Sequence, residues 1–74
     1  MTAEELLALL DDRALAKLKK NVWYEAARCW TEYHEAVRAG EPTSTTNVLC
    51  DAAWASESWF RTVYDAQRDR MAQP

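Results

Sequence analysis

One stretch of this 74-residue chain decides its fold: Ala39-Gly40-Glu41-Pro42-Thr43-Ser44-Thr45-Thr46-Asn47. Gly40 is the only glycine of the sequence, and the only proline besides Pro42 is the last residue. Glycine readily adopts the left-handed backbone that ends helices, and a proline just beyond it cannot continue one. The Ser, Thr and Asn residues that follow are favoured N-caps for a second helix. A single break between two long segments predicts an antiparallel helical hairpin.

The segment after the break has the periodicity of a helix over about residues 46–71. At about 100° per residue, one face gathers seven apolar residues, and we expect it to be the core side: Val48, Leu49, Ala52, Trp59, Phe60, Val63 and Ala66. Trp54 lies about 180° from Val63 on this helix. The hairpin alone is therefore not expected to bury Trp54.

The segment before the break also carries an apolar stripe, which predicts a helix over about residues 12–39: Leu15, Leu18, Val22, Ala26, Cys29, Trp30, Tyr33 and Val37. The N-terminal leucines are out of phase with this stripe, so we expect a break at Asp11-Asp12, where either aspartate can cap the new helix. Thr2 and Glu5 have the spacing of a capping box for a short helix over about residues 3–10. The alternative is one unbroken helix from residue 3 to 39.

The two long helices alone do not provide a packing partner for every apolar residue of the chain. Residues of the two long helices lie level when their numbers sum to about 85, as Val22 and Val63 do, because both helices rise equally per residue. Residues 3–12 then have no level partner. They must fold back over the open end or bury their leucines against another subunit. The chain is thus predicted to be one all-α domain, residues 1–74, completed by self-association into a helical bundle, with a dimer favoured.

Composition excludes several classes. The net charge of −3 disfavours a general binder of polyanions. The leucine-rich run of residues 6–10 is far too short to span a membrane, so we expect no membrane partner and a cytoplasmic location. Two cysteines make no disulfide framework, and Cys29 and Cys50 are offset by about 9 Å along the hairpin. Frequent Ala, Arg and Trp are typical of a bacterium with a GC-rich genome or of its phages.

No pattern of residues points to catalysis, a metal or a cofactor. His34 is the only histidine, and the neighbouring Glu32 and Glu35 point away at different angles on a helix. Neither cysteine lies in a Cys-x-x-Cys motif. We therefore expect no catalytic, metal-binding or cofactor-binding residues, and the interpretation as an enzyme ranks last.

The surplus apolar residues favour protein binding instead. Trp23, Ala27, Trp30 and His34 widen the apolar arc of their helix beyond what one neighbouring helix covers. The predicted function is a small non-enzymatic protein–protein interaction module, such as an adaptor, assembly factor or inhibitor, that binds itself or another protein. Its predicted interface residues are Leu6, Leu7, Leu10, Trp23, Trp30 and Trp54.

The second-ranked interpretation is a small nucleic-acid-binding regulator. A basic face runs along the first long helix between Arg13 and Arg28, and Tyr24 offers a ring on which a base can stack. The residues that would contact nucleic acid are Lys17, Lys20, Tyr24 and Arg28.

Overall fold

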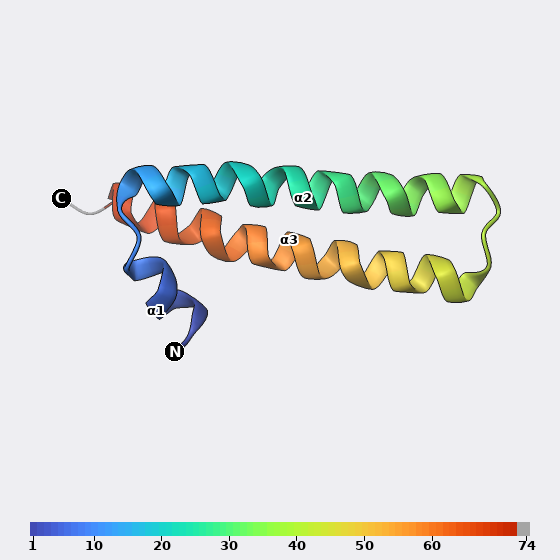
Figure 1. The fold of residues 1–74 in the computed structure, drawn as a ribbon, viewed down its shortest axis with the longest axis horizontal. Helices are drawn as coiled ribbons and strands as arrows, with labels where there is room; N and C mark the ends of the chain where they lie inside the picture. Colours follow the sequence, from blue (N-terminus) through green and yellow to red (C-terminus); the bar gives the residue numbers. More distant parts are fainter. Residues whose placement is uncertain (73–74) are drawn as a thin grey trace.

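The computed structural model describes residues 1–72, which form three helices: α1 (Ala3–Ala8), α2 (Asp12–Arg38) and α3 (Thr43–Ala72). α2 and α3 lie side by side in opposite directions, and α1 packs against α3 at the open end of this hairpin (Figure 1). The body measures 50 × 22 × 17 Å. The predicted all-α hairpin with a short first helix is confirmed. The last two residues of the predicted domain 1–74 lie outside the described residues.

The end of α2 is built around Gly40, as its sequence predicts. Gly40 has a φ of 74°, and its N–H donates to the carbonyl of Val37 at 3.1 Å. The N–H of Glu41 donates to the carbonyl of Ala36 at 3.0 Å. These two bonds make a Schellman motif, which satisfies carbonyls that the end of the helix would otherwise leave without partners.

The start of α3 lies three residues earlier than predicted. The carbonyl of Pro42 accepts the N–H groups of Thr45 at 2.9 Å and Thr46 at 3.1 Å, so the helix already begins at Thr43. Proline is well suited to a helix start, because its fixed φ is helical and the N–H it lacks would have no partner there. The Ser and Thr residues that were expected as caps therefore lie inside the first turns.

The break between α1 and α2 is confirmed. The carboxylate of Asp11 accepts the N–H of Ala14 at 2.7 Å and caps α2. The hydroxyl of Thr2 accepts the N–H of Glu5 at 3.2 Å and donates to its carboxylate at 3.2 Å. Each helix thus has its own N-terminal cap, which is the local reason that residues 3–38 do not form one helix.

The hydrophobic core lies in the open half of the hairpin. Its buried cluster joins all three helices and consists of Leu7, Leu15, Val22 and Val63. Leu10, Leu18, Phe60 and Ala66 pack against this cluster while keeping some exposure. Val22 and Val63 share the core, as their predicted level positions require. Towards the loop the buried residues are small, namely Ala26 and Ala53.

The predicted core face of α3 is correct for Leu49, Phe60, Val63 and Ala66 and wrong for the other three residues. Val48, Ala52 and Trp59 are exposed, Trp59 by 37%. The residues that face α2 are instead spaced alternately four and three apart: Leu49, Ala53, Ser56, Phe60, Val63, Gln67 and Arg70. This is the 3.5-residue repeat of helices that pack along their length, and a straight 100° wheel drifts from it by about 20° every seven residues. In α2 the same drift leaves Val37 exposed and half-buries Ala36.

Candidate protein-interaction surface

Trp54 packs across the hairpin against Trp30. The two ring centroids are 5.2 Å apart and the planes meet at 82°, an edge-to-face arrangement. The expectation that the hairpin does not bury Trp54 is confirmed, and the contact with Trp30 is an addition that the helix periodicity did not predict. Even so, Trp54 remains 57% exposed. The pair fixes the ring while leaving much of its surface open.

Further aromatic side chains extend this surface along the hairpin. His34 stacks on Trp30 with centroids 6.1 Å apart. Trp23, seven residues before Trp30 and so on the same side of α2, is 51% exposed. The ammonium of Lys19 lies 4.8 Å from the ring centre of Tyr64, and Lys19 is four residues before Trp23 on the same side of α2. We call these residues the aromatic face: Trp23, Trp30, His34, Trp54 and Tyr64.

Two shallow hollows flank the exposed tryptophans. One, of about 290 Å³, lies between α2 and α3 beside Trp23 and is lined by Ala16, Lys19, Lys20, Trp23 and Gln67. The other, of about 440 Å³, is lined by Trp54, Glu57, Ser58 and Arg61. The aromatic face thus has protruding rings and adjacent hollows, a shape that allows close complementarity with a partner surface.

The N-terminal leucines divide between the core and the surface. Leu7 is only 3% exposed and lies in the core cluster, and Leu10 packs against it. Leu6 and Leu9 face outward. Among the three leucines predicted as interface residues, Leu6 is therefore the one that this chain leaves open.

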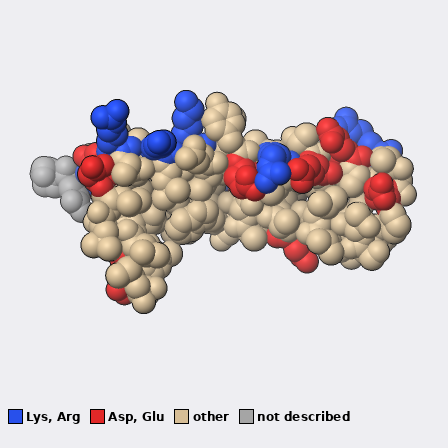
Figure 2. Space-filling view, viewed as in Figure 1, with Lys and Arg blue, Asp and Glu red and all other residues tan. Residues whose placement is uncertain are grey.

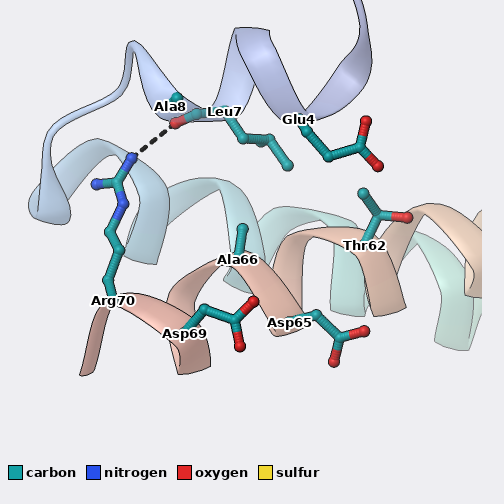
Figure 3. A pocket seen from close by; sticks show the side chains of 8 residues that line it. All are labelled: Glu4, Leu7, Ala8, Thr62, Asp65, Ala66, Asp69 and Arg70. Carbon is teal, nitrogen blue, oxygen red and sulfur yellow. Dashed lines mark hydrogen bonds between the residues drawn. The ribbon is translucent and has the colours of Figure 1, made fainter. Parts of the chain in front are cut away.

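Arg70 holds α1 in place, a role that sequence reasoning missed. Its guanidinium donates to the carbonyl oxygen of Leu7 at 2.7 Å (Figure 3). It also donates to the carboxylate of Asp12 at 3.1 Å. The signal was its position seven residues after Val63, on the packed side of α3. A hollow of about 580 Å³ lies beside this contact, lined by Glu4, Leu7, Ala8, Thr62, Asp65, Ala66, Asp69 and Arg70.

The predicted basic face is exposed but partly neutralised. Lys17, Lys20 and Tyr24 are open to solvent. Arg28, however, donates to the carboxylates of Glu25 and Glu32, the latter at 3.2 Å, and its hydrogen bond to Glu25 raises the pKa of Arg28. Figure 2 shows basic side chains along α2 near the open end and acidic ones beside them towards the loop. Arg28 is therefore engaged within the chain rather than free for a phosphate.

The groups that could carry chemistry are occupied or isolated. Within residues 1–72 no three His, Cys, Asp or Glu side chains lie close enough to hold a metal ion. Both cysteines are free, and the thiol of Cys29 lies 3.4 Å from the hydroxyl of Ser56, its level partner on α3. None of the described helices is both long and apolar enough to cross a bilayer.

Comparison with known proteins offers no relative: no family model matches the chain, and no curated protein or solved structure matches it significantly. The most distinctive part of the molecular surface is the aromatic face.

Proposed function

We propose that this chain is a small non-enzymatic protein–protein interaction module, an adaptor, assembly factor or inhibitor, that binds through its aromatic face and associates with itself. The observation that carries the proposal is the half-exposure of two tryptophans on one side of the hairpin, 51% for Trp23 and 57% for Trp54. Tryptophan is among the residues most enriched at the centres of protein interfaces.

The two exposed tryptophans offer a large apolar contribution to binding. Together the open parts of Trp23 and Trp54 amount to about one fully exposed tryptophan, so covering them removes about 200 Å² of largely apolar surface. At about 25 cal/mol per Å², this contributes ~5 kcal/mol before the costs of association. The contact with Trp30 already orders Trp54, so less side-chain entropy is lost on binding.

The polar groups near the aromatic face fit a rim better than a reaction centre. Lys20, Glu57 and Arg61 border the two hollows. His34 stacks on Trp30. Charged groups around an aromatic centre are the usual anatomy of an interface that forms and dissociates.

A photo-crosslinking experiment tests this function. The photoreactive residue p-benzoylphenylalanine replaces Trp54 in one variant, Trp23 in a second and Thr31 in a third, in the cells that produce the chain. Thr31 is exposed, points away from the core and lies outside the aromatic face, about 100° from Trp30 around α2. Discrete adducts at positions 54 and 23, identified by mass spectrometry and absent at position 31, support the proposal. No adduct, or equal adducts at all three positions, contradicts it.

A further inference from the structure

We infer that the aromatic face is occupied by a second copy of this chain, placed antiparallel to the first so that two hairpins form a four-helix bundle. This inference rests on the proposed function and names its partner. It follows from three properties of the chain: the area it exposes, the distribution of its charges and the positions of its tryptophans.

The exposed area exceeds that of a compact monomer by about one interface. The chain exposes 5571 Å² of surface and has a mass of 8.5 kDa. A folded monomer of this mass is expected to expose about 4,650 Å². The surplus of about 900 Å² is close to the ~800 Å² that each partner buries in a standard stable interface. A second copy on one broad side of the hairpin would remove this surplus.

The charges of the hairpin are divided between its two halves. The open half, residues 12–22 and 60–72, carries seven basic and three acidic residues, a net charge of +4. The loop half, residues 23–59, carries two basic and six acidic residues, a net charge of −4. A parallel pair would place like halves together, whereas an antiparallel pair places +4 against −4. Packed helix axes are about 8–10 Å apart, roughly one screening length at physiological salt. Because Glu25 and Glu32 lie about 140–160° from Trp30 around α2, the preference for the antiparallel pair is a long-range effect of the two halves and not a contact between charges on the aromatic face.

The acidic residues of α1 do not cancel this pattern on the aromatic face. α1 packs on the side of α3 that carries Thr62, Ala66 and Asp69. Thr62 and Tyr64 are two residues apart and therefore about 160° apart around the helix. Glu4, Glu5 and the rest of α1 consequently lie away from the surface that the second copy would cover.

The positions of Trp23 and Trp30 are compatible with a twofold axis that relates two copies of the chain. Trp23 and Trp30 lie on either side of Ala27, which is near the middle of the hairpin. An axis at that level brings Trp23 of one copy to the level of the Trp30–Trp54 pair of the other, and the reverse contact forms by symmetry. Trp23 of each copy then lies at the hollow beside Trp54 of the other copy, and both copies use the same surface residues for the contact.

The orientation is measured with spin labels on the outward side of α2. Arg13, Thr31 and Arg38 are exposed and lie about 160–180° from Val22 around the helix, so labels there point away from the core and replace no residue of the aromatic face. Each is changed singly to cysteine in a Cys29→Ala/Cys50→Ala background. Circular dichroism and sedimentation first confirm that this background keeps the helicity and mass of the wild type. Label-to-label distances within the dimer are then measured by electron spin resonance.

An antiparallel dimer predicts a position-dependent result. With the axis near Ala27, the separation along the bundle is about 14 Å for position 31, about 40 Å for position 13 and about 35 Å for position 38. Position 31 thus gives the shortest distance. The dimer should also weaken several-fold between 50 mM and 500 mM salt, because opposite charges hold it in register.

Two other outcomes would contradict the antiparallel dimer without contradicting protein binding through the aromatic face. Equal distances at all three positions mean a parallel pair. A monomer at every concentration, with discrete crosslinks from positions 54 and 23 to a different protein, means that the face has another partner. In both cases the binding role of the aromatic face stands, and the monomer result withdraws only the self-association. Only the absence of crosslinks and of self-association together would remove both.

Discussion

The guanidinium of Arg70 donates a hydrogen bond of 2.7 Å to the carbonyl oxygen of Leu7, joining the last helix to the first across the open end of the hairpin. This carbonyl belongs to the last turn of α1 and also accepts the N–H of Leu10 at 3.1 Å. The side chain of Arg70 is only 26% exposed and also meets Asp12 at 3.1 Å. One residue thus ties α1 and the start of α2 to α3, which closes the core without a second subunit.

Replacing Arg70 tests this closure. We expect Arg70→Met to lower the free energy of unfolding by about 1–3 kcal/mol, since a half-buried hydrogen bond to a carbonyl is lost. Amide hydrogen exchange in α1 should accelerate more than in α2. Arg68→Met is the matched control, because Arg68 pairs only with exposed carboxylates, and it should cost less than about 1 kcal/mol. Equal losses in urea unfolding would contradict the assigned role of Arg70.

The leucines of α1 give a second test. Leu7 is 3% exposed and Leu9 is 72% exposed. Leu7→Ala should therefore destabilise the monomer by about 2–5 kcal/mol, whereas Leu9→Ala should cost under about 0.5 kcal/mol. Both are measured by urea unfolding at low protein concentration. If Leu7→Ala has no effect on a dilute sample, α1 does not pack on its own hairpin.

The loop offers a third test. Gly40 has a φ of 74°, and a Cβ added there would have no atom within 4 Å. The cost of Gly40→Ala is therefore purely conformational, about 1–2 kcal/mol. Gly40→Asn should cost clearly less, because asparagine tolerates the left-handed region. Thermal unfolding of the three proteins checks the order, and an alanine variant as stable as the wild type would contradict the Schellman motif.

Features of the fold that depend on neighbouring residues could be predicted from the sequence, whereas features that depend on residues far apart in the sequence could not. Breaks at Asp11 and Gly40 follow from local chemistry, and both were predicted. The rotation of α3 depends on supercoiling accumulated over many turns, so a straight wheel placed the exposed Val48, Ala52 and Trp59 on the core face. Arg70 was missed because its partner is a backbone carbonyl 63 positions away. No sequence pattern marks such an acceptor.

Only those residues of the candidate surface that depend on the periodicity of a single helix could be predicted from the sequence. A surplus of apolar residues on α2 is a property of one helix, so Trp23 and Trp30 could be selected from periodicity. Whether a leucine of α1 is open depends on how α1 docks. The core takes Leu7 and leaves Leu6 outside, a choice made by tertiary packing alone.

The pairing of Arg28 leads to a fourth prediction, about nucleic acid. With Arg28 held by Glu25 and Glu32, the basic face retains Lys17 and Lys20 as free cations beside Tyr24. We expect no binding to single- or double-stranded DNA or RNA in a filter assay at 50 mM salt, because few phosphates could be neutralised. Binding that disappears in a Lys17→Glu/Lys20→Glu variant would favour the nucleic-acid interpretation instead.

The central claim is that the aromatic face is buried by protein contact, and sedimentation equilibrium tests it most directly. Trp54→Gln alters that face, whereas Trp59→Gln alters an exposed tryptophan about 140° away around α3. The wild type should approach twice its monomer mass as concentration rises into the high micromolar range. Trp59→Gln should behave alike, and Trp54→Gln should weaken association at least tenfold with helicity unchanged. A wild-type monomer at all concentrations, or equal weakening by both variants, would contradict self-association through this face.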